Sequence, residues 1–300
     1  MLFRSGLSVT AEADWDIEKQ FDVKAGGKLV ITTDQGSIRV DSHSLEVVEV
    51  LLEVVGFEED DLRTEFDQNG ADVRVDVDVK RHTSWGRRHL KFTVLVPASY
   101  NLDLNTSGGS ISADNVSGTV DADTSGGSLD FKNIVGDIRA HTSGGSIDAK
   151  EIEGSVRVRT SGGSIDIEDV SGEVLADTSG GSVSVVNVGG DLEAETSGGS
   201  MRIEDIKGNT EASTSGGSIR ARFAQQPAGD VSLATSGGGI KVKLGADVNM
   251  SLYARARKIR SEVEVDGRTE AKNRLNGDIN DGGPSLELRA HSGSVSLESI

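Results

Sequence analysis

A five-residue segment, Thr-Ser-Gly-Gly-Ser, recurs in this 300-residue chain at a constant interval of 18 residues. The copies begin at Thr106, Thr124, Thr142, Thr160, Thr178, Thr196 and Thr214, and Thr235 opens a related Thr-Ser-Gly-Gly-Gly after a three-residue insertion. A unit of 18 residues is too short to bury a core alone, so neighbouring copies must stack on one another. The period therefore predicts a repeat protein.

Apolar and polar residues alternate on both sides of each segment. The residue after the segment is aliphatic in every copy, and a second small or apolar residue follows two positions later, as in Ile165 and Ile167. Alternation with period 2 is typical of a strand with one buried face. A glycine such as Gly172 follows, and the alternation then resumes up to the next threonine. Each repeat is expected to form two short strands joined by two turns.

The glycine pairs inside the repeated segment are the structural residues that the period singles out. They are expected to form the repeated turns between strands. The pairs are Gly108, Gly109, Gly126, Gly127, Gly144, Gly145, Gly162, Gly163, Gly180, Gly181, Gly198, Gly199, Gly216 and Gly217.

Two strands per 18 residues in constant register predict a flattened coil. Each strand then pairs in parallel with its equivalent one coil away, at the ordinary strand spacing of about 4.8 Å. The predicted fold class is all-β, a two-sheet parallel β-solenoid with irregular β caps at both ends. Parallel crossovers are right-handed in about 98% of cases, which favours a right-handed coil.

Four regions are expected along the chain. Residues 1–14 resemble a non-native or truncated leader, because their apolar stretch is short for a secretory signal, although a lost export signal is an open alternative. Residues 15–104 are expected to form an N-terminal β cap and irregular first coils, with a first coil already at Gly36-Ser37-Ile38; a separately folding domain is the alternative. Residues 105–245 hold the regular repeats. Residues 246–300 are expected to form C-terminal irregular coils and a cap, with residues 285–297 as the last coil.

Composition narrows the function classes. The net charge of -18 disfavours a nucleic-acid partner, since neutralising phosphates needs clustered lysines and arginines. The chain has no cysteine, which excludes disulfides and thiol chemistry. No apolar run approaches the roughly 18 residues of a membrane span, so no span is expected.

Candidate chemistry is weak at every position considered. Repeated threonine and serine hydroxyls are better explained as partners for turn backbone groups than as nucleophiles, because a catalytic group has no reason to recur in each coil. The five histidines, at positions 43, 82, 89, 141 and 291, show no metal-ligand spacing. We therefore expect no catalytic residue, no cofactor and no metal ligand.

A calcium-stabilised β-roll is the alternative fold most similar to the predicted β-solenoid, because such rolls also complete a coil in 18 residues. Their aspartates ligate the cation from a Gly-Gly-x-Gly-x-Asp motif. Here Asp130, Asp148 and Asp166 occupy a comparable column, but an aliphatic residue replaces the third glycine, and Lys132 and Lys150 follow in the next outward column. Calcium is therefore not the favoured interpretation.

Three groups of residues resemble the bacterial "putative adhesin" or toast-rack family. They are the Thr-Ser-Gly-Gly-Ser-Ile turns, the segment Phe21–Leu29, and the closing segments Gly282–Leu288 and His291–Val295. The resemblance extends from about Trp15 to Leu297. It implies a β-solenoid displayed on the extracytoplasmic side of bacterial cells, in a family linked to envelope stress and without an established catalytic activity.

The expected function is a non-enzymatic extracytoplasmic scaffold or adhesin-like binding module, located in the periplasm or at the cell surface. A repeat-built enzyme with its site in the irregular ends is the alternative. The partner is expected to be an unidentified protein or envelope surface, held mainly by the irregular residues 58–85 and 254–284. Self-association through the ends of the solenoid is also open.

Overall fold

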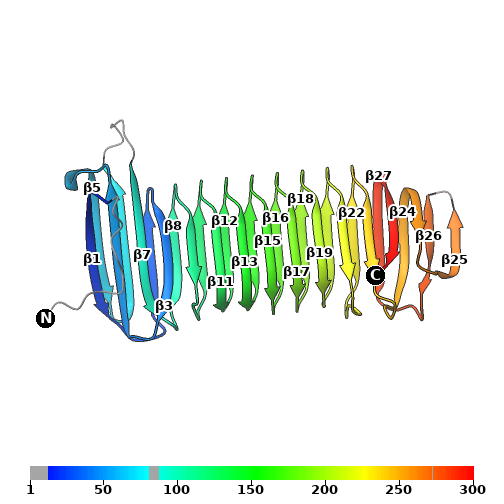
Figure 1. Cartoon of the computed structure of the whole chain (residues 1–300), viewed down its shortest axis with the longest axis horizontal. Helices are drawn as coiled ribbons and strands as arrows, with labels where there is room; N and C mark the ends of the chain where they lie inside the picture. Colours follow the sequence, from blue (N-terminus) through cyan, green and yellow to red (C-terminus); the bar gives the residue numbers. More distant parts are fainter. Residues whose placement is uncertain (1–12, 81–87, 272) are drawn as a thin grey trace. The chain divides into compact units, whose positions relative to one another are not determined.

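The computed structural model describes residues 13–80, 88–271 and 273–300, and most of them lie in β-strands (Figure 1). The residues predicted as a leader lie mostly outside the described part of the chain, as do His82 and the end of the irregular segment 58–85. The chain divides into two compact units, residues 1–147 and residues 148–300. The prediction of an all-β fold is confirmed.

The first unit contains twelve strands and one short 3-10 helix in its described residues. They are β1 (Trp15–Asp22), β2 (Lys28–Thr33), β3 (Ser37–His43), β4 (Val47–Val55), η1 (Glu59–Asp61), β5 (Leu62–Asn69), β6 (Asp72–Val79), β7 (His89–Pro97), β8 (Asn101–Thr106), β9 (Ile111–Asp114), β10 (Val120–Thr124), β11 (Leu129–Val135) and β12 (Ile138–Thr142).

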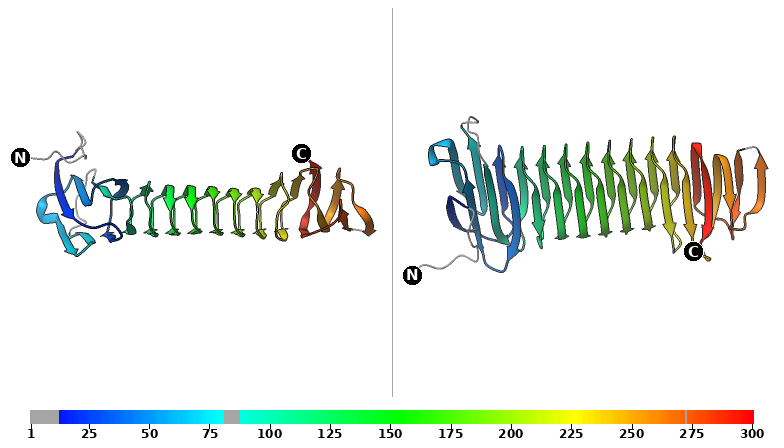
Figure 2. Two further views of the ribbon diagram at one scale, coloured as in Figure 1. Left: turned by 90° about the horizontal axis from the view of Figure 1, so that it is seen from below. Right: turned by 45° about the horizontal axis from the view of Figure 1, so that its top comes forward.

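The regular coils of this unit form two parallel sheets. Strand β10 pairs in parallel with β8 and β12, whereas β11 pairs in parallel with β9. The register places Thr124 opposite both Thr106 and Thr142, so equivalent residues of successive coils face one another. Figure 2 shows the strands of these coils side by side. The predicted two-sheet parallel β-solenoid is thereby confirmed.

The first coil begins in the N-terminal region, as the Gly36-Ser37-Ile38 sequence predicts. Strand β2 pairs in parallel with β8 and β3 with β9, so that Thr33 lies opposite Thr106 and Ile38 opposite Ile111. Further strands extend each sheet beyond this coil. One sheet continues through β6 and the antiparallel β5, and the other continues through β7 and the antiparallel β4 and β1.

Tyr100 is the largest fully buried side chain of this region. Its hydroxyl donates a hydrogen bond to the backbone carbonyl of Ala71. Burial, and secondarily the charge of Asp72, raise the pKa of Tyr100 from 10.0 to about 12. The neutral phenol is therefore the form that the fold favours.

The unfolding free energy should fall as the pH rises through the pKa of Tyr100. The raised pKa stabilises the folded state fully below pH 10, and this contribution of about 2 to 3 kcal/mol is lost as the pH approaches 12. Urea denaturation at pH 9 and at pH 12 measures the difference. Tyr100→Phe removes the titrating group and should lose less stability over this interval; an equal loss in both proteins would contradict the prediction.

The second unit continues the same architecture. Its strands are β13 (Ile147–Glu153), β14 (Val156–Thr160), β15 (Ile165–Val170), β16 (Val174–Thr178), β17 (Val183–Val188), β18 (Leu192–Thr196), β19 (Met201–Ile206), β20 (Thr210–Thr214), β21 (Ile219–Phe223), β22 (Val231–Thr235), β23 (Ile240–Leu244), β24 (Met250–Ser261), β25 (Asp266–Ala271), β26 (Arg274–Ile279) and β27 (Ser285–Ser299). Strands β14, β16, β18, β20 and β22 form one parallel ladder, and β15, β17, β19, β21 and β23 form the other.

Residues 285–297 do not form the last coil, so this prediction is wrong. The long strand β27 makes a whole coil, because its first half pairs in parallel with β22 and its second half with β23. Strand β24 precedes β27 in the sequence but pairs in parallel with its other side. Strands β26 and β25 then follow β24 as an antiparallel pair. Apolar and polar residues alternate in both β24 and β27, so this pattern could not predict which of the two strands pairs directly with β22 and β23.

In six successive coils one residue adopts the left-handed conformation immediately before the aliphatic residue of the second turn. These residues are Asn115, Asn133, Glu151, Asp169, Asn187 and Asp205, with φ between 53° and 61°. Asparagine and aspartate tolerate this conformation better than most residues, because their short polar side chains bond locally. Their side chains also form ladders, as where the Asn187 amide donates to the Asp169 carboxylate at 2.5 Å.

Candidate functional site

The repeated turn is held together by its threonine. The Thr178 hydroxyl donates a hydrogen bond of 2.8 Å to the carbonyl oxygen of Gly163 in the preceding coil. The Thr178 hydroxyl oxygen in turn accepts a hydrogen bond of 3.3 Å from the backbone N–H of Gly181 in its own turn. Thr124, Thr142, Thr196, Thr214 and Thr235 repeat both contacts. The buried hydroxyl of each turn is thus engaged with backbone groups, in agreement with the structural role expected from the sequence.

The two glycines of each turn have different roles. A Cβ added to the second glycine would overlap the backbone of the preceding coil, as Gly181 would overlap the carbonyl of Gly163. A Cβ on the first glycine meets much less. At Gly180 it would lie 3.5 Å from the carbonyl oxygen of Gly162, an ordinary contact, and in the tightest copy, Gly237, it would lie 3.1 Å from the carbonyl oxygen of Gly216. Close backbone approach therefore requires the second glycine, while space alone does not require the first.

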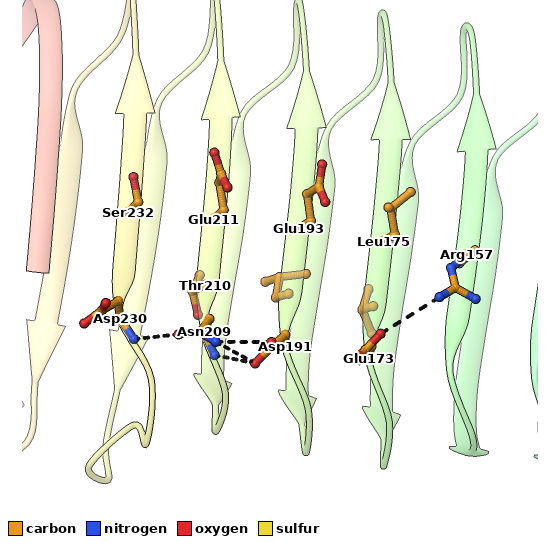
Figure 3. A pocket seen from close by; sticks show the side chains of 12 residues that line it. Arg157, Glu173, Leu175, Asp191, Glu193, Asn209, Thr210, Glu211, Asp230 and Ser232 are labelled. Atoms are coloured by element: carbon orange, nitrogen blue, oxygen red, sulfur yellow. Dashed lines mark hydrogen bonds and ion pairs between the residues drawn. The ribbon is translucent and has the colours of Figure 1, made fainter. Parts of the chain in front are cut away.

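An acidic groove of about 390 Å³ lies on the outer face of the sheet of even-numbered strands (Figure 3). Its acidic lining residues are Glu173, Asp191, Glu193, Glu211 and Asp230, and Arg157 lies at one end. The Arg157 guanidinium is 3.9 Å from the Glu173 carboxylate.

The aspartates of the acidic groove accept hydrogen bonds from residues of neighbouring turns and strands. The Asn209 backbone N–H and side-chain amide both donate to Asp191, at 2.7 Å and 3.2 Å, and the Ser285 N–H donates to Asp230 at 2.7 Å. Glu193 and Glu211 are paired in register on adjacent strands. Like charges directly opposite one another are unfavourable in a sheet. These two glutamates give the groove an open negative strip.

Thr210 lies at the acidic groove but occupies the inward column, where Leu192 and Val231 are its neighbours in register. It is 2% exposed, and its hydroxyl has no hydrogen-bond partner in the described part of the chain. An unpaired buried hydroxyl loses its water without compensation. No sequence pattern signals this position, because threonine also suits a strand.

Thr210→Val should raise the free energy of unfolding by about 1 kcal/mol, because it removes the unpaired hydroxyl and keeps the shape of the side chain. Urea denaturation of both proteins measures the change. Thr210→Ala is the control, since it removes the hydroxyl but leaves a small cavity and should not stabilise. A less stable Thr210→Val would mean that the hydroxyl has a partner.

Comparison with known proteins identifies the family. The family model described as Toastrack DUF4097 matches residues 26–298. The chain belongs to the Toastrack DUF4097 family. The resemblance inferred from the repeated turns and the two closing segments is thereby confirmed. No curated protein matches the chain.

Three solved structures resemble this Toastrack chain. A protein from Bacteroides fragilis NCTC 9343 described as a "putative adhesin" is 12% identical, with 96% of this chain and 99% of that chain covered and a TM-score of 0.36. A "putative cell adhesion protein" from Clostridium sporogenes ATCC 15579 is 9% identical, with 95% and 100% covered and a TM-score of 0.22. A "putative adhesin" from Parabacteroides distasonis ATCC 8503 is 11% identical, with 95% and 97% covered and a TM-score of 0.29.

The histidines that the structure describes in the Toastrack chain belong to four different strands. His43 bonds locally, with Nε2 3.0 Å from the carbonyl of Val47. His89, His141 and His291 are exposed on different strands. Across residues 13–80, 88–271 and 273–300, no group of three or more histidines or carboxylates is arranged to hold a metal ion. None of these residues belongs to a helix long and apolar enough to cross a membrane.

Treatment of the Toastrack chain with a calcium chelator should leave the melting temperature unchanged. The reason is that hydroxyl-to-backbone bonds and parallel ladders join the coils, as Thr178 and Gly163 illustrate. Circular dichroism with and without chelator measures the effect, with added magnesium as the control for ionic strength. A large downward shift would instead favour the calcium-stabilised β-roll, with ligands in the column of Asp130, Asp148 and Asp166.

Proposed function

We propose that this protein is a non-enzymatic, adhesin-like β-solenoid that works on the extracytoplasmic side of a bacterial cell, in the periplasm or at the surface, and that takes part in the response to envelope stress. The observation that carries the proposal is the use of the repeated hydroxyls. The hydroxyls of Thr178 and its equivalents donate to a backbone carbonyl of the preceding coil and accept from a backbone N–H of their own turn. The repeat therefore works as a scaffold, and family membership supports the same role.

Within this function, the regular coils set length and the irregular ends hold the partner, an envelope surface or an envelope protein. The ends carry the segments that depart from the repeat, and binding residues concentrate on such segments. The ends also carry strand edges: among the described residues, β25 pairs only with β26. An unpaired edge can accept another strand, which offers a route to self-association through the ends.

The test compares the intact chain with a variant that lacks residues 124–141. The excised segment is one complete period, and the register of β10 with β8 and β12 shows that Thr142 can take the place of Thr124. Fluorescently labelled protein is incubated with bacterial cells and with isolated envelope fragments. We expect retention to survive the deletion, and the envelope glycans and proteins to be recovered without cleavage.

A second variant examines the repeated faces directly. Glu193→Gln combined with Glu211→Gln neutralises the open strip of the acidic groove and leaves the coil ladders intact. Retention should be unchanged in this variant. Loss of retention in either variant would place the partner on the repeated faces and contradict the proposal that the regular coils serve only as a spacer that sets length. Cleavage of envelope material would show that the protein is an enzyme.

A further inference from the structure

Three arginines lie side by side on the outer face of the C-terminal sheet. The register places Arg255 of β24 opposite Arg274 of β26 on one side and opposite Arg289 of β27 on the other. All three side chains are exposed. At about 4.8 Å per strand the row is roughly 10 Å long. This concentration of positive charge occurs in a chain whose net charge is -18.

The charges of this row are poorly compensated. Farther along the same outward row, Arg159 forms an ion pair of 2.8 Å with Asp177. In the described part of the chain, Arg255 and Arg274 have no ion-pair partner, and Arg289 contacts Glu287 on its own strand. Like charges opposite one another on neighbouring strands repel. An anion placed across the row would relieve this repulsion.

A groove accompanies the row. It has a volume of about 550 Å³ and is lined by Arg255, Arg257, Arg289 and His291 together with serines of the neighbouring turns, among them Ser215 and Ser236. We call it the arginine groove. Hydroxyl groups can also donate hydrogen bonds to anions, although more weakly than the charged guanidinium groups do. The lining thus offers several donors, and its three arginines carry its positive charge.

The acidic surface of the rest of the sheet does not cancel this charge. The two strands next to β27 place Ala234 and Ser213 in the same row, and the first carboxylate is that of Glu195. Glu195 is therefore three strands from Arg289, or about 14 Å, and it accepts a hydrogen bond of 3.5 Å from Ser213 at the opposite edge of the groove. The Debye length at physiological ionic strength is about 8 Å, so most of the influence of Glu195 is screened.

We propose that the arginine groove, together with Arg274 next to Arg255 in the row, binds an oxyanion-bearing ligand, a short segment that presents two or three carboxylate or phosphate groups. The planar guanidinium group forms paired hydrogen bonds with either oxyanion. The acidic remainder of the protein repels a long polyanion and so limits the bound segment to the length of the row. The inference rests on the proposed function, because the groove is the part of the C-terminal end that would hold the partner.

The test uses two probes, a linear hexaphosphate and a hexameric oligogalacturonate, each titrated into the full chain by isothermal titration calorimetry at 50 mM and 300 mM salt. At least one probe should bind at low salt and bind more weakly at high salt. Arg255→Ser combined with Arg274→Ser should lower the affinity at least about tenfold, because charge-assisted hydrogen bonds are lost. The probe that binds more tightly identifies the oxyanion.

Arg159→Ser is the matched control. It removes one exposed arginine from the same row, but this arginine is paired with Asp177 and lies far from the groove. Its affinity for the probes should equal that of the unmodified chain. Absence of binding of both probes at 50 mM salt would overturn the proposal, as would an equal loss of affinity in the control. Melting curves confirm that the exposed substitutions leave the fold intact.

The two proposals fail in different ways. If cells retain the protein through its ends but neither probe binds, the oxyanion site is wrong and the proposed function stands. If a probe binds through Arg255 and Arg274 but cell retention is lost on deletion of residues 124–141, the site stands and the spacer function is wrong.

Discussion

Gly181→Ala is expected to lower the free energy of unfolding by at least about 3 kcal/mol, because the new methyl group would overlap the backbone of the preceding coil. The obstructing atoms are the carbonyl of Gly163 and the amide nitrogen of Ser164, which are backbone atoms and cannot move aside without separating the coils. The separation would also lengthen the bond from the Thr178 hydroxyl to the same carbonyl. Urea denaturation measures the loss.

Gly180→Ala is the matched control for this prediction, because it adds the same methyl group to the same turn. Its nearest contacts lie at 3.5 Å, the distance of ordinary van der Waals contact. The free energy of unfolding should therefore change by less than about 1 kcal/mol, with a contribution from the reduced freedom of the unfolded chain. Equal losses for the two variants would show that the coil spacing does not depend on the second glycine.

Ile165→Asp is expected to cost about 4 kcal/mol, because it places an unpaired carboxylate in an apolar interior. Ile165 is fully buried and lies opposite Val183 of the next coil. Thermal unfolding followed by circular dichroism should show a large fall in melting temperature. Ile165→Val serves as the control and should cost only about 1 kcal/mol. An unchanged melting temperature for Ile165→Asp would contradict the inward orientation of this column.

The regular coils could be predicted from the sequence because two independent signals agree there. The period of 18 residues fixes which residues face one another in successive coils, and the alternation fixes which of them point inward. Thr160, Thr178 and Thr196 consequently lie in register, as their spacing requires. The structural role of their hydroxyls was also predictable, since a group that recurs in every coil must satisfy a need that recurs in every coil.

The ends could not be predicted in the same way, because no period ties their strands together. The register among β24, β26 and β27 depends on contacts between strands that are distant in sequence, such as Arg255 with Arg289. The arginine row therefore could not be predicted from the sequence, although Arg255 belongs to the segment that was expected to bind a partner. The residues in the left-handed conformation could be predicted in part, because most of them are asparagine or aspartate. Glu151 does not follow this pattern.

The position of β27 has a consequence for the order of events during synthesis. Domains generally fold from the N-terminus as the chain emerges, at about 5 to 20 residues per second. Strand β24 emerges before β27, yet its place in the finished sheet is against β27, which itself lies against β22 and β23. Until β27 has been synthesised, the edges of β22 and β23 are unpaired, and β24 could pair with them in place of β27. The fifteen residues of β27 therefore take a place between strands that were synthesised before them, β22 and β23 on one side and β24 on the other.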